Sequence, residues 1–136
     1  GRNGLDLVSH WGGDPKAYKG TVVPDFPNFY CLYGPNSNIV VGASIVFFVE
    51  CQLRYAMGCL KLQLENGYQT IECKKDVMDR YNEQIDALNR ERAWGAPSVK
   101  SWYKNDRGRV TQNWPGTHGE WWQQTLAPDP ADFTLR

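Results

Sequence analysis

The apolar spacing of residues 44–65 places the strongest constraint on the fold of this chain. Apolar side chains recur there at steps of three and four residues, while charged side chains fall on another stripe. Ser44 can cap the start, and Asn66-Gly67 supplies a stop. The pattern predicts a long amphipathic helix whose first two turns, apolar on all sides, are buried. The repeating apolar residues are Ile45, Val49, Leu53, Ala56, Leu60 and Leu64.

The other elements are predicted to be shorter. A second helix is expected over residues 76–92 and a last short helix over residues 118–126. Strands are expected at residues 29–33 and 70–73, and short extended pieces at residues 21–23 and 99–103. Residues 34–43 are expected to form a loop, and the tail from Ala127, with its prolines, to be laid on the surface or disordered. These elements predict a mixed α/β fold, α+β for this chain taken alone, with the long helix packed on short strands and a loop-rich C-terminal part.

Charge, hydropathy and cysteine spacing exclude several classes of function. The formal net charge is zero, so phosphate backbones and anionic membranes are not expected partners. The longest apolar stretch, residues 39–49, is shorter than the roughly 20 residues that span a bilayer, so no membrane span is expected. The four cysteines show no CxxC pair and no zinc-site spacing with His10 or His118. Buried reduced thiols, no metal site and a cytoplasmic location are therefore predicted.

Two segments could contact a ligand. Gly34-Pro35-Asn36 forms a turn shortly before the long helix, whose start offers free N–H groups and a positive dipole end that favour negative charge. Ser101-Trp102-Tyr103-Lys104-Asn105 offers an indole that can stack on a ring. Lys104 or Arg109 could reach a phosphate.

These motifs together resemble the C-terminal segment of class B flavin monooxygenases of the Baeyer-Villiger type, particularly the branch that oxidises aryl ketones such as 4-hydroxyacetophenone. The resemblance rests on residues 25–36, on Ser101-Trp102-Tyr103-Lys104-Asn105 and on Gln112-Asn113-Trp114-Pro115. It covers nearly the whole chain. The chain departs from the cyclic-ketone enzymes after Trp102, where they carry a Pro-Gly-Lys stretch.

The resemblance implies a site for two cofactors. It implies that Pro35, Asn36, Ser44 and Ile45 line an FAD site, and that Trp102 belongs to a mobile lid over NADPH. Residues 1–136 then form one C-terminal fragment. Its parts are an irregular lead-in (1–28), a strand-loop-helix FAD-capping corner (29–66), a strand and second helix (67–92) and an NADP-facing lid and tail (93–136).

The implied parent enzyme uses NADPH and FAD to insert one oxygen atom from O₂ into ketones or onto heteroatoms. No GxGxxG stretch and no FxGxxxHxxxW fingerprint occur in this chain, so FAD- and NADP-binding domains are expected upstream. No general acid or nucleophile is expected here, and neither His10 nor His118 is expected to be catalytic. The isolated fragment should be inactive and should self-associate through its uncovered apolar face.

Two alternatives remain open from the residues alone. Six tryptophans are many for this length, and flat ring faces could hold a carbohydrate or a small planar ligand in an autonomous binding module. A structural oligomerisation domain is the other alternative.

Overall fold

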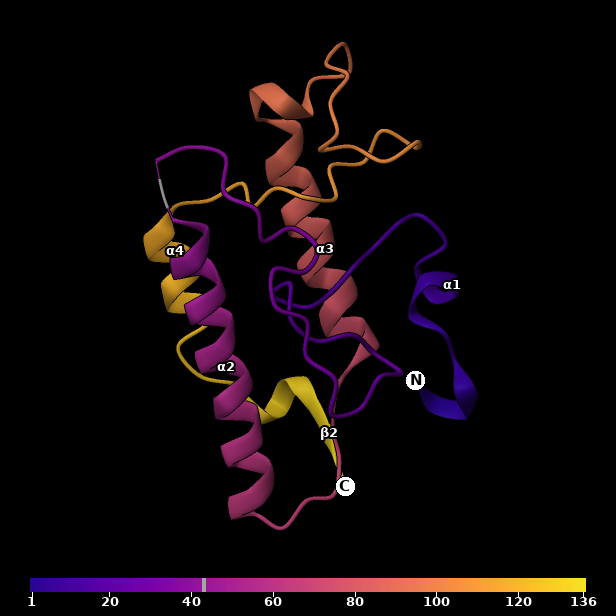
Figure 1. The fold of residues 1–136 in the computed structure, drawn as a ribbon, viewed down its shortest axis with the longest axis vertical. Coiled ribbons are helices and arrows are strands. Elements are labelled where there is room, and N and C mark those ends of the chain that lie inside the picture. Colours follow the sequence, from indigo (N-terminus) through magenta and orange to yellow (C-terminus); the bar gives the residue numbers. More distant parts are fainter. Residues whose placement is uncertain (43) are drawn as a thin grey trace.

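Two long helices flank a layer of irregular chain in the computed structural model, which describes residues 1–42 and 44–136 (Figure 1). Helices α2 and α3 stand on either side, and α4 lies along the upper part of α2. A two-stranded sheet closes the opposite end. The elements in chain order are η1 (Arg2–Gly4), α1 (Leu7–Trp11), α2 (Ile45–Glu65), β1 (Ile71–Cys73), α3 (Lys75–Arg90), η2 (Ala93–Gly95), α4 (His118–Gln124), η3 (Pro130–Asp132) and β2 (Phe133–Leu135).

The predicted helices are confirmed. Helix α2 follows Ser44 and ends at Glu65, and Gly67 then takes the positive φ of 68° that the Asn-Gly stop requires. Helix α4 begins with a capping box in which Thr117 and Glu120 satisfy each other's backbone N–H groups. Within residues 1–42 and 44–136, no helix combines the length and the apolar character that a membrane span requires.

The predicted strand at residues 29–33 is wrong. Asn28 and Tyr33 adopt left-handed backbone conformations, with φ of 58° and 57°, so the chain turns at both ends of the segment. The pieces at residues 21–23 and 99–103 also form no strand in the structure; Val22 only makes an isolated bridge to Tyr18.

The tail is ordered, which corrects the expectation that it is laid on the surface or disordered. Strand β2 pairs antiparallel with β1, so that Ile71 faces Leu135 and Cys73 faces Phe133. Phe133 is 4% exposed. The tail is held because its apolar side chain completes the core, and the strand predicted at residues 70–73 is confirmed as its partner.

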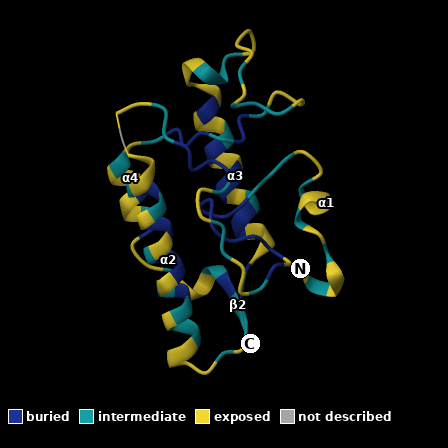
Figure 2. Cartoon of the chain, viewed as in Figure 1, coloured by how far each residue is buried: buried dark blue, intermediate teal, exposed yellow. Residues whose placement is uncertain are grey.

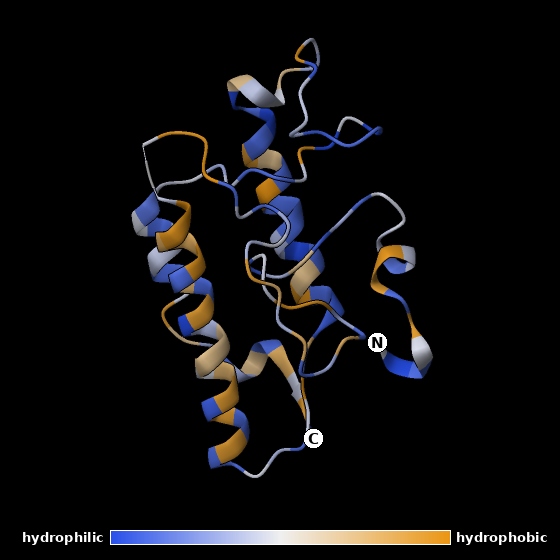
Figure 3. Cartoon of the chain, in the orientation of Figure 1, coloured by the Kyte–Doolittle hydropathy of each residue, from blue (hydrophilic) through white to orange (hydrophobic). Residues whose placement is uncertain are grey.

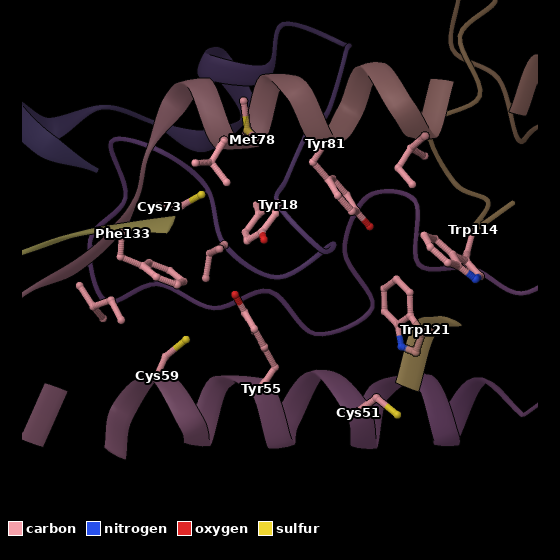
Figure 4. Close-up of a cluster of buried hydrophobic side chains, with 14 of the residues drawn as sticks. Tyr18, Cys51, Tyr55, Cys59, Cys73, Met78, Tyr81, Trp114, Trp121 and Phe133 are labelled. Carbon is pink, nitrogen blue, oxygen red and sulfur yellow. The ribbon is translucent and has the colours of Figure 1, made fainter. Parts of the chain in front are cut away.

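An aromatic core joins the two long helices. Figure 4 shows Tyr55 on α2 and Tyr81 on α3 both pointing into the space between the helices, where Tyr18 of the irregular layer lies. Cys51, Cys59 and Cys73 are buried here, as predicted, and Cys31 is half-buried; all four thiols are free. The core is therefore built largely from large aromatic side chains, which bury much area per residue.

Helix α2 is apolar on two faces, which the periodicity alone did not separate. The face that packs inward carries Phe48, Tyr55 and Cys59, all 0% exposed. A different set of apolar side chains lies outward, where Figures 2 and 3 show exposed and hydrophobic positions along the helix, while Ala56 of the predicted stripe is buried. The expectation that the first two turns are buried is therefore wrong for Ile45 and Val46. The outward stripe consists of Val46 (63% exposed), Leu53 (49%), Met57 (56%) and Leu64 (78%).

Candidate functional site

The turn at Gly34-Pro35-Asn36 is locked to the segment that follows the Trp102 loop. The backbone N–H of Asn36 donates to Thr111 O at 2.9 Å, and that of Asn38 donates to Gln112 O at 2.8 Å. The backbone N–H of Trp114 in turn donates to Asn38 O at 2.8 Å. The two segments that sequence reasoning singled out separately thus form one hydrogen-bonded unit.

Asn36 occupies a left-handed backbone position, with φ of 56°, that asparagine tolerates better than most residues. Its side chain is buried, 1% exposed, and donates to Val110 O at 2.8 Å and Asn113 O at 3.1 Å. Its amide therefore holds the turn together from inside. The side chain of this predicted FAD-site residue therefore makes its hydrogen bonds within the protein.

The outer side of the same turn is hollowed. A hollow of about 330 Å³ is lined by Pro35, Cys31 and Leu32 together with Trp11 and Thr111. Burial raises the pKa of the Cys31 thiol, so a neutral, largely apolar surface surrounds the turn.

The start of α2 is open to a ligand. Ser44 occupies the N-cap position, but its side chain makes no capping hydrogen bond. Ser44 is exposed, and Ile45 is 46% exposed. The first-turn N–H groups and the positive helix end thus remain available to an electron-rich group.

Trp102 is the exposed member of the second segment. The residue is 69% exposed, and its ring lies 4.6 Å from the ring of Tyr103, at an interplanar angle of 51°. It lies in a turn of the loop that follows η2. In Figure 1 this loop extends beyond the end of α3, apart from the start of α2. Trp102 therefore presents a free ring face, whereas the structure gives no contact between it and Ser44 or Ile45.

The cations that could reach a phosphate are engaged elsewhere. Lys104 Nζ donates to Ala96 O at 2.6 Å and Val99 O at 3.0 Å. Arg109 is 13% exposed and is held by two aspartates, Asp14 and Asp86. The suggestion that Lys104 or Arg109 meets a phosphate is therefore not supported by their placement; both stabilise the loop.

Three asparagines, Asn38, Asn89 and Asn113, form a hydrogen-bonded network beside the turn. The sequence pattern did not predict it, because apolar periodicity carries no information on such polar contacts. Asn38 donates to Asn113 Oδ1 at 2.8 Å, and Asn89 on α3 donates to Asn113 O at 3.1 Å. The available signal was the gathering of asparagines beside Gly and Pro, where short amide side chains replace backbone partners.

The histidines make packing contacts. His10 lies 5.4 Å from Phe26 and His118 lies 6.0 Å from Phe48, ring centre to ring centre and edge-on. In the part of the chain that the structure describes, no cluster of three or more His, Cys, Asp and Glu could hold a metal ion.

Comparison with known sequences finds monooxygenases along the whole chain. A Baeyer-Villiger monooxygenase of Pseudomonas aeruginosa is 38% identical over 85% of this chain, which spans 22% of that enzyme. The FAD-binding monooxygenase ktnD of Aspergillus niger is 33% identical over 100% of the chain, or 23% of that protein. An uncharacterised monooxygenase, y4iD, of Sinorhizobium fredii is 34% identical over 98% of the chain, or 20% of that protein. The chain thus spans about a fifth to a quarter of these relatives.

Solved structures share the fold. An oxidised steroid monooxygenase bound to NADP superposes with a TM-score of 0.82 at 22% identity, over 99% of this chain and 26% of that one. A cyclohexanone monooxygenase mutant from Rhodococcus sp. Phi1 bound to NADP+ gives 0.81 at 22% identity, over 100% and 25%. No protein-family model matches the chain.

Proposed function

Since this chain is homologous to the C-terminal segment of Baeyer-Villiger and other FAD-binding monooxygenases, we propose that it is the cofactor-contacting part of such an enzyme. The parent protein would use NADPH, FAD and dioxygen to insert one oxygen atom into a ketone or onto a heteroatom. The observation that carries the proposal is identity of 33–38% to monooxygenases over most of the chain. The fold agrees with it.

The residues at the start of α2 fit a flavin. The bound flavin would supply redox chemistry with NADPH and dioxygen. The open N–H groups after Ser44 and the helix dipole would stabilise negative charge on the ring edge that faces them. Ile45, exposed beside them, would cover the ring with an apolar surface, and Pro35 would border the same site.

Trp102 would contact the nicotinamide cofactor. The residue is 69% exposed, so its indole can stack on a ring or donate its N–H to a ribose. The surrounding turn would act as a lid that excludes water from the reaction. Within this segment no residue is assigned as a general acid or nucleophile.

The outward stripe of α2 would be covered by the upstream FAD- and NADP-binding domains. A run of exposed aliphatic residues from Val46 to Leu64 along one helix is typical of an interface. Without those domains, the segment would associate with itself. We place the parent enzyme in the cytoplasm because its four thiols in this segment are free.

The binding-module alternative is not favoured. Four of the six tryptophans are buried or half-buried. The remaining two, Trp102 and Trp122, lie in different elements, and Arg54 covers the Trp122 ring at 5.3 Å. They offer no shared platform for a sugar.

The test uses the enzyme with its upstream domains. Purified protein is supplied with NADPH and either an aryl ketone or an alkyl sulfide under ¹⁸O₂, and the product is examined by mass spectrometry. Incorporation of one ¹⁸O atom with NADPH consumption is expected. Trp102→Ala should raise the KM for NADPH about 10-fold, whereas Trp122→Ala should leave it unchanged. Absence of flavin binding and of labelled product with every substrate would overturn the proposal.

A further inference from the structure

Arg109 lies between the two segments to which the proposed function assigns FAD and NADPH. It lies one residue before the end of a short hairpin, residues 104–110, that begins two residues after Trp102 and is closed by a bridge between Lys104 and Val110. Its guanidinium reaches away from this hairpin into the protein. There it meets the Gly34-Pro35-Asn36 turn, helix α3 and the lead-in segment.

The guanidinium uses all of its hydrogen-bonding capacity internally. Arginine carries five N–H donors in a fixed plane. Nε donates to both carboxylate oxygens of Asp86 at 3.0 Å. Nη1 donates to Asp14 Oδ1 at 3.3 Å and Pro15 O at 2.8 Å, and Nη2 donates to Asn36 Oδ1 at 3.2 Å and Asn82 Oδ1 at 3.1 Å. No donor is left for a bound phosphate, so the side chain acts on the protein alone.

The charges around this guanidinium are balanced. Arg109 pairs with Asp14 and Asp86, and Lys16 Nζ lies 3.5 Å from the other oxygen of Asp14. Two cationic side chains, Arg109 and Lys16, therefore pair with two carboxylates, and all four side chains are largely shielded from solvent. A lysine at position 109 would keep the charge but could not reproduce the planar, five-donor arrangement.

Hydrogen bonds also hold the backbone of Arg109 to the hairpin that follows Trp102. Asn105 N–H donates to Arg109 O, and Arg109 N–H donates to Asn105 Oδ1, both at 2.9 Å. Thr111 N–H donates to Tyr103 O at 2.9 Å, next to Trp102. On the other side, the same guanidinium contacts Asn36 directly. One side chain thus connects the hairpin that follows Trp102 to the turn before α2.

We propose that Arg109 is a positioning residue that couples the two cofactor sites, so that occupancy of the Trp102 site tightens binding at the turn before α2. This inference rests on the proposed function. Such coupling is a ratio of affinities and is reciprocal between the two ligands. A residue that only stabilises the fold would change both affinities and leave their ratio unchanged.

The experiment measures the FAD dissociation constant of the apoenzyme, with its upstream domains, by flavin fluorescence. Titrations are made with and without saturating NADP+. In the wild type, NADP+ is expected to tighten FAD binding by roughly 5-fold or more. In Arg109→Lys this ratio should fall to near one. Arg90→Gln, an exposed change on α3, is the control and should keep the wild-type ratio.

The Asp86→Asn variant provides a second, milder test. It loosens Arg109 from α3 without altering the turn before α2 or the Trp102 loop, and it should lower the ratio by a smaller factor. If Arg109→Lys does not fold, this variant decides: a lowered ratio supports the coupling role, and an unchanged one overturns it.

The outcomes separate this inference from the proposed function. A wild-type enzyme that oxygenates its substrate while NADP+ leaves FAD affinity unchanged would overturn the coupling role alone. So would an Arg109→Lys enzyme with the wild-type ratio. A wild type that binds no FAD would overturn the proposed function and this inference together.

Discussion

Trp121 stacks on Phe48, with ring centroids 4.8 Å apart and ring planes 19° from parallel. Both side chains are 0% exposed, and the Trp121 indole N–H donates to Phe48 O at 3.3 Å. Trp114 meets the same indole edge-on at 5.2 Å. Through these rings α4 fixes the first turns of α2, and thereby the open helix start that we assign to the flavin.

Removing this indole should strongly destabilise the segment. Trp121→Ala is expected to lower the free energy of unfolding by about 3–5 kcal/mol, because it leaves a large cavity between α2 and α4. Its neighbour Trp122 is 43% exposed and makes a cation–π contact with Arg54, so Trp122→Ala should cost less than about 1 kcal/mol. Urea denaturation measures both. Equal losses would contradict the packing role of Trp121.

Substitutions of Asn36 should separate two contributions to stability, the hydrogen bonds of its side chain and its tolerance of the left-handed backbone conformation. Asn36→Ala removes three side-chain hydrogen bonds, two donated to backbone oxygens and one accepted from Arg109, and places a Cβ residue without a polar side chain at φ of 56°. A loss of about 3 kcal/mol is expected. Asn36→Gly loses the same bonds but tolerates the backbone conformation, so it should be about 1 kcal/mol less damaging. Thermal unfolding of the two variants compares them; a glycine variant less stable than the alanine variant would refute the backbone argument.

Stability should fall at alkaline pH. Burial raises the pKa of the Cys59 thiol to about 12, so above the pKa near 9 of an unfolded thiol the native state binds more protons than the unfolded state. The contribution of the neutral Cys59 thiol to the free energy of unfolding is therefore fully present below pH 9. It is lost at about 1.4 kcal/mol per pH unit as the pH rises from about 9 toward 12.

Other buried acids steepen this decline. Burial also raises the pKa of Cys73 and of Tyr55. The free energy of unfolding, measured at intervals from pH 8 to 11, should decline less steeply in Cys59→Ala than in the wild type. Identical slopes would show that Cys59 ionises freely in the native state.

The C-terminal strand should be required for the core. Phe133 is 4% exposed and lies opposite Cys73 in the sheet. Phe133→Ala is expected to cost about 3–5 kcal/mol, whereas Thr134→Ala, at a half-buried position of the same strand, should cost under about 1 kcal/mol. Chemical denaturation provides the comparison, and a mild effect at Phe133 would mean that the tail is dispensable.

The outward stripe of α2 should drive self-association of the isolated segment. We expect oligomers in light scattering over a concentration series, because no upstream domain covers Leu53 and Met57. Leu53→Glu with Met57→Glu should shift the segment toward monomer. Gln84→Glu adds negative charge on the exposed face of α3 and should not. A wild-type monomer at all concentrations would contradict the interface.

The helices could be predicted from sequence because their signals are local. The spacing within residues 45–65 and the stop at Asn66-Gly67 act within a few residues of each other, so they fix α2 without knowledge of the rest. The identity of its inward face could not be read this way. Phe48 and Tyr55 face inward because distant partners, including Trp121 and Tyr18, are large enough to fill that side.

The site could be predicted only in part for the same reason. The turn at Pro35 and the exposed Trp102 were recognisable from their own residues. The bonds that join them were not, since Arg109 finds Asp14, Asn36 and Asp86 far along the chain. The residues next to an arginine in the sequence do not show whether its guanidinium is exposed to a ligand or buried in ion pairs within the protein.

The pairing of β1 with β2 has a consequence for biosynthesis. Ile71 pairs with Leu135 and Cys73 pairs with Phe133. Strand β1 therefore has no pairing partner until residues 133–135, which are synthesised much later, have left the ribosome. Helix α2 can form on the emerging chain, because its hydrogen bonds are local. The core beneath β1 cannot close until the final strand is released. Until then, the buried side chains that Phe133 packs against in the folded segment remain exposed on the nascent chain.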